Sequence, residues 1–232
     1  MNWIALVPMR SGSKGIRNKN TVPIAGKPLY QYTIEAAIEA KASQIFISTN
    51  ILGLPKRKYS SLVTYLSRSE SLSTDETPMS EVVLDFLNNP DYSKLSSRSI
   101  IVLLQPTSPL RKASDITKSL ELFSNSNSDL LISVTKGDKS VLKSGFIENG
   151  NFKPVSSIEY CFQNRQLLPE IFKPNGAIYI FKAGWFQKNQ SFETPSIIAY
   201  KMDPEKSHDV DTKSDLEKIE KILLKEETNE NR

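Results

Sequence analysis

The sequence predicts an α/β fold, a three-layer α/β/α sandwich in which helices cover both faces of a mostly parallel sheet. Two patterns lead to this prediction. Short apolar runs without polar alternation are typical of strands buried on both faces, and they span residues 4–7, 45–47, 100–104, 130–134, 177–181 and 197–200. Stretches with helical spacing of apolar residues lie between these runs, and this alternation favours a parallel sheet.

Three helices are predicted between the strands, each with its apolar residues on one face. Those faces carry Tyr30, Ile34, Ala37 and Ile38; Val82, Val83, Phe86 and Leu87; and Ile116, Leu120 and Phe123. Proline is favoured at the first position of a helix because its missing N–H has no intrahelical partner there. We therefore expect the first two helices to begin at Pro28 and Pro78, and the third to be capped by Ser114.

Two stretches interrupt the alternation. Residues 51–73 are rich in serine and lysine and only residues 62–66 resemble a strand, so we interpret this stretch as a long irregular connection. Residues 136–174 mix Gly, Asn and Pro with isolated apolar pairs, which predicts short strands or hairpins that project from the sheet. We expect a single domain over residues 1–232, with residues 136–174 as a small dimerisation lobe.

The composition indicates one substantial core and an anionic partner. The 232 residues are 38% hydrophobic and carry a formal net charge of +4. Because the charges are mixed along the chain rather than gathered in a basic tail, nucleic acid is not favoured as a partner. Cys161 is the only cysteine, interpreted as a structural thiol, and no apolar run is long enough to span a membrane. We expect a soluble cytoplasmic protein without a membrane partner.

Residues 10–20, RSGSKGIRNKN, follow the first predicted strand and combine cations with small residues. Arg10, Lys14, Arg17 and Lys19 can converge on a ligand that a backbone of small residues lets approach closely. Because α/β sheets bind ligands at the carboxyl ends of their strands, this loop is a candidate polyphosphate site. It has neither the P-loop spacing nor the dinucleotide-binding spacing. A solvated basic surface loop is the alternative.

Asp209 and Asp211 flank Val210 just before a predicted C-terminal helix. Alternate side chains of an extended segment point to the same side, so the two carboxylates can share one hard cation such as Mg²⁺ or Mn²⁺. The alternative is that they only favour the helix N-terminus electrostatically. The helix itself should begin at Thr212, because Asp215 completes a capping box, and its apolar face carries Leu216, Ile219, Ile222 and Leu223.

Four segments together resemble one enzyme family. They are RSGSKGIRNKN at 10–20, LLQPTSPLR at 103–111, KPNGAIYI at 173–180 and DVDT at 209–212. In order and spacing they are similar to the cytidylyltransferases that activate nonulosonic acids, the CMP-sialic acid synthetase family. The resemblance implies a Rossmann-like nucleotidyltransferase fold and a homodimer. It also implies a reaction in which CTP and an acidic nine-carbon sugar give the CMP-sugar and pyrophosphate with Mg²⁺.

The resemblance assigns residues to the nucleotide. Those that match the family's triphosphate, ribose and base contacts are Arg10, Ser13, Lys14, Lys19, Asn20, Arg68 and Thr77. Within this set Asn20 matches the ribose contact, Arg68 matches the arginine against the cytosine, and Thr77 falls near a main-chain contact to the base edge. The catalytic residues implied are Arg10, Lys14, Lys19 and Asp211.

The resemblance also assigns residues to the sugar and the metal. The sugar contacts implied are Gln105, Thr107, Ser108, Arg111, Lys143, Arg165, Gln166, Lys173 and Asn175. The first four lie in QPTSPLR, whose alternative interpretation is a rigid turn set by its prolines. Some of the others act across the dimer interface in this family, and cations there suit a sugar carboxylate. The metal ligands implied are Asp209 and Asp211.

The implied mechanism is in-line attack of the sugar's anomeric hydroxyl on the α-phosphorus of CTP. Such transfers depend mainly on positioning and charge neutralisation, which are roles for the loop cations. No general base is evident in the sequence. His208 is the only histidine, and we interpret it as an exposed neighbour of the ligand Asp209 rather than as the base. Asp211 or a water at the metal is left to take the proton.

The chain also departs from the family pattern. Asn50 stands where aspartate usually ends the second strand, Arg17 replaces a frequent proline, and Lys173 sits where some members have arginine. The chain reads NGAIYIF where the pseudaminic acid branch has DAGQFYW, which favours sialic or legionaminic acid and leaves these two open. The rival hypotheses are a cytidylyltransferase for a pseudaminic or Kdo-like acid, a nucleotide-binding module without catalysis, and a nucleic-acid binder.

Overall fold

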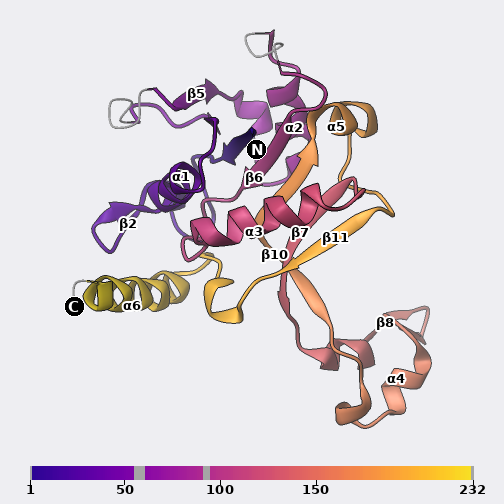
Figure 1. The fold of residues 1–232 in the computed structure, drawn as a ribbon. Coiled ribbons are helices and arrows are strands. Elements are labelled where there is room, and N and C mark those ends of the chain that lie inside the picture. The colour runs from indigo at the N-terminus through magenta and orange to yellow at the C-terminus, as the bar shows by residue number, and fades with distance from the viewer. Residues whose placement is uncertain (1, 55–60, 91–94, 231–232) are drawn as a thin grey trace.

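The structure, a computed structural model, describes residues 2–54, 61–90 and 95–230. Its centre is a seven-stranded sheet with the strand order β11-β7-β10-β6-β1-β4-β5. The strands are β1 (Trp3–Pro8), β4 (Gln44–Thr49), β5 (Val63–Ser67), β6 (Ile100–Leu104), β7 (Leu130–Lys136), β10 (Phe172–Lys182) and β11 (Ile197–Lys201). Every predicted apolar run is a strand of this sheet (Figure 1).

The sheet is mostly parallel, as the sequence predicts. β1 pairs in parallel with β4 and β6, β4 with β5, and β7 with β11. β10 runs antiparallel to both of its neighbours, β6 and β7. A strand that returns next to its predecessor needs no crossover helix. The chain between β7 and β10 is therefore free to leave the sheet.

The strand β5 corrects one expectation. We interpreted residues 51–73 as an irregular connection in which only residues 62–66 resemble a strand. Val63–Ser67 do form a strand, and it pairs in parallel with β4 at the edge of the sheet, so this stretch belongs in part to the sheet. Only Val63 and Leu66 of this strand are buried, so its apolar signal is short. Edge strands carry less buried surface than central ones, which is why the pattern is weak. Residues 55–60 of the same stretch lie outside the described residues.

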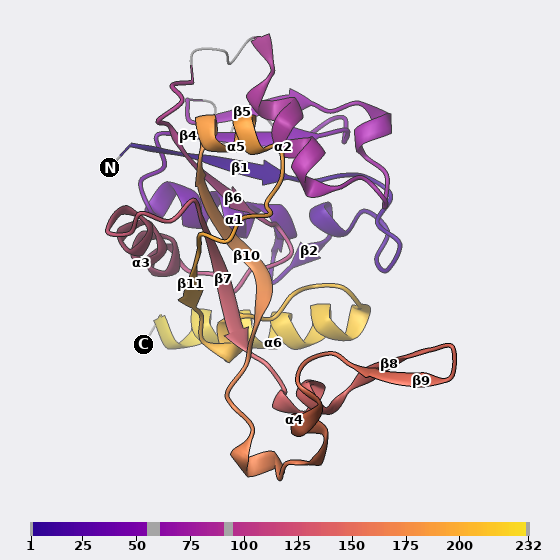
Figure 2. The same ribbon diagram turned by 90° about the vertical axis from the view of Figure 1, so that its right-hand side faces the viewer.

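Helices cover both faces of the sheet, which confirms the three-layer sandwich (Figure 2). α1 (Leu29–Glu39) and α3 (Ala113–Ser124) pack on the face that presents Val102 and Ile180. α2 (Met79–Leu87) and α5 (Ala183–Asn189) pack on the opposite face, which presents Leu103 and Phe181. Successive residues of one strand thus enter different core clusters, as the pleat requires.

The helix starts differ from the prediction by one or two residues. Pro28 and Pro78 precede α1 and α2 instead of forming their first helical positions. α3 begins at Ala113, before the predicted cap Ser114. The reason is that the Asp115 carboxylate accepts the backbone N–H of Lys112 at 3.0 Å, so a carboxylate inside the first turn does the capping.

The C-terminal helix, α6 (Lys213–Glu230), begins as predicted. The Asp215 N–H donates to Thr212 Oγ1 at 3.2 Å, and the Asp215 carboxylate accepts from the Thr212 N–H at 2.8 Å. These two bonds complete the capping box. A third apolar cluster joins α6 to the loop after β1 and to the small ribbon of β2 (Pro23–Ile24) and β3 (Lys27–Pro28), and it contains Ile16, Ile24, Leu29, Leu110, Val210, Ile219 and Leu223.

The lobe, residues 136–174, projects away from the sheet between β7 and β10 (Figures 1 and 2). It contains the antiparallel hairpin of β8 (Gly145–Glu148) and β9 (Asn151–Pro154) and the short helix α4 (Ile158–Phe162), so the predicted hairpin is present. Many of its large apolar side chains are exposed, including Phe146 at 65%, Ile147 at 70%, Phe162 at 84% and Leu167 at 71%. Pairing of subunits through this lobe stays a prediction.

Within the described ranges, every helix falls short of the length or the apolar character that a membrane span requires.

Candidate functional site

A cavity of about 410 Å³ opens at the carboxyl ends of β1, β5 and β6. This is the edge at which α/β sheets bind ligands. The cavity brings together all the predicted nucleotide residues with Asp211 and part of the predicted sugar set. The predicted residues in its wall are Arg10, Ser13, Lys14, Lys19, Asn20, Arg68, Thr77, Gln105, Thr107 and Asp211. The basic loop is thus part of a concave site rather than of a plain surface.

A carboxylate that the sequence analysis did not single out lies between the loop cations. Asp75 forms ion pairs with Arg10 and with Lys14, the latter with a distance of 3.1 Å between Nζ and Oδ2. Hydrogen bonds from Lys14 and Arg10 lower the pKa of the Asp75 carboxyl, so it is ionised at neutral pH. In the sequence, only the position of Asp75 between two predicted site residues, Arg68 and Thr77, indicated a role at the site. An anion therefore already occupies the point where the cations converge.

The basic loop is fixed against the segment that carries Asp211. Lys19 Nζ lies 2.8 Å from Asp211 Oδ1. Gly15 packs directly on the backbone carbonyl oxygen of Asp211, and a Cβ at this position would collide with it. Asn20 is buried and donates to the carbonyl oxygen of Arg10 at 3.1 Å, which closes the loop on itself. These contacts hold the cations in place before any ligand binds.

Arg68 forms another wall of the cavity and is only 5% exposed. Its Nη2 donates to the carbonyl oxygen of Met9 at 2.9 Å and its Nε to Ser73 Oγ at 3.1 Å. Burial and a neighbouring guanidinium lower the pKa of Arg68, which still remains protonated at neutral pH. In the same wall, Thr77 Oγ1 lies 2.8 Å from Thr74 Oγ1, so the hydroxyls brace the loop. The hydrogen bonds to Met9 and Ser73 hold the planar guanidinium of Arg68 in one orientation.

The turn after β6 contributes two predicted residues to the cavity and two to the core. Gln105 and Thr107 line the cavity, and the Gln105 side chain packs against Gly176. Ser108 and Arg111 are each only 2% exposed. Neither lies in the described wall of the cavity, so their role as sugar contacts stays a prediction that this conformation does not support.

Arg111 instead ties the turn to the sheet from inside. Its Nη1 donates to the carbonyl oxygens of Gln105 at 3.1 Å and Ala177 at 2.8 Å, and its Nη2 donates to Thr33 Oγ1 at 2.6 Å. Burial lowers the pKa of Arg111 to about 9, so the guanidinium is still charged at neutral pH. For this residue the rigid-turn interpretation of the motif is correct.

Asp209 and Asp211 occupy different environments. Val210 between them is buried, and its N–H donates to the carbonyl oxygen of Thr107 at 2.9 Å. Asp211 is exposed at the cavity, whereas Asp209 is half-buried beside Thr107. Burial raises the pKa of the Asp209 carboxyl, and the nearby Asp211 carboxylate acts in the same direction.

The residues present fit a hard cation that is held jointly with a ligand. Asp209 Oδ1 is buried and has no hydrogen-bond partner among the described residues. A buried carboxylate oxygen without a partner is unfavourable unless a cation or proton reaches it. In the part of the chain that the structure describes, no group of three or more His, Cys, Asp or Glu forms a complete metal site. Two aspartates alone suit Mg²⁺, which takes further ligands from substrate phosphates and water.

His208 is half-buried, which corrects its expected exposed position. Burial and the nearby Lys218 lower its pKa, and thereby favour the neutral imidazole at neutral pH. The wall of the cavity, as far as it is described, does not include it.

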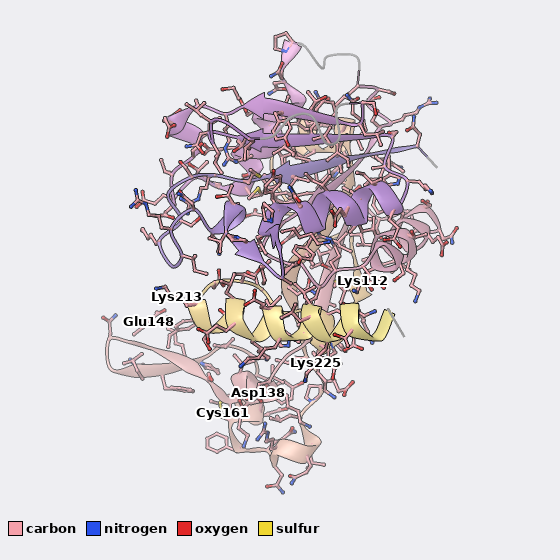
Figure 3. All side chains as sticks on the ribbon, turned by 90° about the vertical axis from the view of Figure 1, so that its left-hand side faces the viewer. Lys112, Asp138, Glu148, Cys161, Lys213 and Lys225 are labelled. Atoms are coloured by element: carbon pink, nitrogen blue, oxygen red, sulfur yellow. The ribbon has the colours of Figure 1, made fainter. Side chains whose placement is uncertain are left out.

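Three predicted sugar residues, Lys143, Arg165 and Gln166, lie in the lobe, outside the described wall of the first cavity. Arg165 pairs with Asp138 at 3.2 Å and lines a second cavity of about 400 Å³ at the base of the lobe. Figure 3 shows Asp138 and Cys161 in the lobe, beyond α6 and apart from the main body. One chain alone does not bring these residues to the nucleotide residues, so their role stays a prediction that requires a second subunit.

The amide of Asn175 is engaged within the protein. Its Oδ1 accepts from Ser133 Oγ at 2.6 Å and its Nδ2 donates to Ser207 Oγ at 3.0 Å. The bond to Ser207 connects Asn175, which lies at the register shift in β10, to the segment that leads to Asp209. These bonds give Asn175 a structural role, and its predicted contact with the sugar stays a prediction. Lys173 is exposed on the same strand, and its role stays a prediction.

Comparisons with known proteins agree with this geometry. A sequence model of the family described as cytidylyltransferase matches residues 4–231. The chain is 34% identical over 226 residues to an N-acylneuraminate cytidylyltransferase of Streptococcus agalactiae serotype III (strain NEM316), which covers 93% of this chain and 52% of that protein. It is 32% identical over 231 residues to the CMP-N,N'-diacetyllegionaminic acid synthase of Legionella pneumophila, which covers 96% of this chain and 97% of that protein.

The chain thus spans about half the length of the N-acylneuraminate cytidylyltransferases that it matches, and nearly all of the legionaminic acid enzyme. Among solved structures, a CMP:2-keto-3-deoxy-manno-octonic acid synthetase complexed with CTP superposes with a TM-score of 0.69. The sequence identity in that comparison is 16%, and it covers 97% of this chain and 100% of the other. At this identity the likeness concerns the fold.

Proposed function

Because the chain belongs to the cytidylyltransferase family, we propose that it transfers a cytidylyl group from CTP to a nonulosonic acid, with pyrophosphate as the second product. The observation that carries the proposal is the cavity in which Arg10, Lys14 and Lys19 converge beside Arg68 and Asp211. This set supplies cations for a triphosphate and a carboxylate for its metal ion. The volume of about 410 Å³ lies within the range of small-molecule sites, roughly 300–1,000 Å³.

The loop after β1 binds the triphosphate in this proposal. Arg10 and Lys14 already hold the carboxylate of Asp75, and a phosphate group presents the same charge and the same kind of oxygen acceptors. Lys19, fixed at Asp211, extends the row of cations toward the carboxylates. Negative charge that builds on the leaving pyrophosphate meets these cations once phosphate oxygens have replaced the Asp75 carboxylate, and such charge stabilisation is the main source of catalysis in these reactions.

Arg68 and Asn20 position the nucleoside part. The guanidinium of Arg68 is held by Met9 and Ser73, so it offers a planar, fixed surface to the cytosine. The amide nitrogen of Asn20 is engaged with the carbonyl oxygen of Arg10, and we assign its side-chain oxygen to a ribose hydroxyl. The base and the triphosphate are thereby held from two different walls.

The proposal includes Mg²⁺, for which Mn²⁺ is a chemical substitute. Asp209 and Asp211 are the ligands, because the unpartnered Oδ1 of Asp209 lies on the same short segment as the exposed carboxylate of Asp211. When bound, the ion supplies positive charge beside the phosphates. The chain contributes the positioning of both carboxylates through the buried Val210 and its bond to Thr107.

The anomeric hydroxyl of the sugar attacks the α-phosphorus in line with the departing pyrophosphate. We assign Gln105 and Thr107 to the sugar side, since they share the cavity with Asp211. Asp211 is the nearest candidate to accept the proton of the attacking hydroxyl. Asp211 becomes neutral when it takes up the proton, and its partner Lys19 is then free to balance negative charge on the phosphates.

The sugar is sialic acid or legionaminic acid in this proposal, in keeping with the sequence NGAIYIF and with the names of both relatives. A Kdo-like or pseudaminic acid is the rival within the same chemistry. A module that binds nucleotide without catalysis is disfavoured by the joint presence of Lys19 and Asp211 in one ion pair. We also propose a cytoplasmic location, on the ground of the single cysteine.

A homodimer is the remaining part of the proposal. The exposed apolar residues of the lobe are more than a hairpin of this size can bury by itself, and a second copy is the simplest cover for them. A partner lobe would also supply Arg165, Gln166 or Lys143 to the cavity that holds the sugar.

The test is a pyrophosphate-release assay with CTP against sialic, legionaminic, pseudaminic and Kdo acids, with ATP, GTP and UTP as alternative nucleotides. We expect release with CTP and with sialic or legionaminic acid. Release with none of the acids, although CTP binds, would favour the non-catalytic module. Release with the Kdo acid alone would support the rival substrate.

A further inference from the structure

Asn50, at the end of β4, fixes the start of the basic loop although it lies outside the described wall of the cavity. Its Oδ1 accepts from the backbone N–H of Ser11 at 2.9 Å, and its Nδ2 donates to Ser11 Oγ at 2.8 Å. Two bonds to one residue restrict both its position and its rotation. Ser11 follows Arg10, so Asn50 sets where the first cation of the loop can lie.

The same amide nitrogen is bonded to a second wall. Asn50 Nδ2 donates to both carboxylate oxygens of Glu70, at 3.1 and 3.0 Å. Glu70 opens the 3-10 helix Glu70–Leu72, which connects Arg68 to the loop that carries Asp75. This helix is tied to Arg68 by Ser73, whose Oγ accepts from the Arg68 Nε at 3.1 Å. Asn50 therefore connects two sides of the cavity. We call the loop with Arg10, Lys14 and Lys19 the triphosphate wall, and Arg68 with the 3-10 helix Glu70–Leu72 the Arg68 wall.

We propose that Asn50 and Glu70 form a positioning pair that sets the spacing between the triphosphate wall and the Arg68 wall. The inference rests on the proposed function, because CTP is the ligand that reaches both walls. A ligand that bridges two subsites gains affinity from their fixed separation, in addition to the affinity of each part. Neither residue of the pair lies in the described wall of the cavity, so the pair acts through Ser11 and through the 3-10 helix.

The chemistry of the pair explains why position 50 departs from the aspartate of the family pattern. An amide can donate to Glu70 and accept from Ser11 at the same time, which a carboxylate cannot. Two carboxylates at this distance would repel each other, and one of them would take up a proton or move away. Asn50 and Glu70 are thus chemically matched, and a change in one calls for a change in the other.

The test uses Asn50→Asp, Glu70→Gln and the double variant, with calorimetric binding of CTP, pyrophosphate and cytidine in Mg²⁺ buffer. The carboxylate in Asn50→Asp still accepts from both Ser11 groups, whereas the link to Glu70 is lost and replaced by repulsion between the two carboxylates. We expect the CTP affinity of Asn50→Asp to fall about tenfold, while its affinities for pyrophosphate and cytidine change less than about twofold. The double variant restores a donor and an acceptor, and should regain CTP affinity to within about threefold.

Several results would overturn the proposal. Unchanged CTP affinity in Asn50→Asp would show that the link does not matter, and equal losses for CTP and pyrophosphate would show that the pair only shapes the loop. Failure of the double variant to recover would exclude the matched-pair chemistry. Glu121→Gln, which removes an exposed carboxylate on α3, is the control and should leave all three affinities unchanged. If the wild type fails to bind CTP, the proposed function itself is wrong, which is distinct from a wild type that binds and variants that do not respond.

Discussion

The cavity and the lobe both carry many charged side chains, but their charges are paired in different ways. In the cavity the partners come from distant parts of the chain, as in Arg10 with Asp75 and Lys19 with Asp211. In the lobe the partners are closer in sequence and both members are exposed, as in Lys136 with Glu170 at 2.6 Å. Exposed pairs of this kind contribute little to stability.

The difference shows which region is organised by contacts within one chain. The cavity has buried or braced groups on each wall, such as Arg68 and Asn20, and the third apolar cluster joins it to α6. The lobe instead leaves Phe162 and Leu167 mostly exposed. One region is organised before it meets a ligand, whereas the other lacks a cover for its apolar surface. The predictions below test this contrast from its strongest consequence to its weakest.

Removal of the metal should have the largest effect. Chelation should abolish turnover, and Asp211→Asn should reduce it by about 10³-fold, because the phosphates lose their positive partner. Turnover is measured by pyrophosphate release and Mg²⁺ binding by calorimetry in the presence of CTP. Glu217→Gln, an exposed carboxylate change on α6, serves as the control. Full turnover in excess chelator would show that the aspartates serve only the start of the helix.

Loss of a loop cation should come next. Lys19→Ala and Arg10→Ala should each lower kcat/KM by at least about 10²-fold, since one developing charge loses a fixed donor. The melting temperature should change little, because both side chains lie at the cavity rather than in the core. Lys118→Ala on the exposed side of α3 is the matched control. Near-normal turnover in both cavity variants would contradict the assignment of the loop.

Disruption of the exposed apolar surface of the lobe should have a moderate effect on subunit assembly and on the KM for the sugar. Wild type should sediment at about twice the 26.1 kDa of one chain, and Phe162→Asp with Leu167→Asp should sediment as monomer. If a partner lobe contributes to the sugar site, the KM for the sugar should rise about tenfold while the affinity for CTP stays the same. Leu52→Asp, a change at an exposed apolar residue outside the lobe, is the control. Monomers with an unaltered KM for the sugar would place the whole site in one chain.

Removal of the Asp75 carboxylate, which pairs with the loop cations, should have the smallest effect. It should increase the affinity for CTP. Asp75→Asn leaves Arg10 and Lys14 without their internal partner, so CTP should bind about threefold more tightly in calorimetry at low salt. Weaker binding would show instead that Asp75 assists the nucleotide or its metal. Because Lys14 and Arg10 lower the pKa of Asp75, the wild-type carboxylate competes above that pKa. The difference between variant and wild type should disappear as the pH falls through it.

The central strands could be predicted from the sequence because they are buried on both faces and read as continuous apolar runs. The edge strand β5 gave only a short strand-like signal over residues 62–66, since Val63 and Leu66 are its only buried residues. Helix starts were displaced where a neighbouring group took over the capping, as the Asp115 carboxylate does at Lys112. The sequence pattern indicates where a helix or strand lies, but contacts with other residues determine the residue at which it begins.

The candidate site shows the same division. The spacing of Arg10, Lys14 and Lys19 was enough to indicate an anion site, because the loop follows a buried strand. Motif similarity could not distinguish a side chain that lines the cavity from one that bonds within the protein, as Arg111 does to Ala177 and Asn175 does to Ser133. Asp75 and Glu70, and the contacts of Asn50, escaped prediction because the partners are distant in the sequence.

The antiparallel course of β10 has a consequence for how this protein could be altered. Phe172 pairs with Lys136 across the ladder of β7 and β10, so the chain leaves and re-enters the sheet at neighbouring points. The whole lobe is thus an insertion at the tip of one long hairpin, and a tight turn of about two to five residues would close the same gap. Evolution or protein engineering can exchange such an insertion without changing a single strand pairing. A different surface could thus be grafted here onto an unchanged seven-stranded sheet.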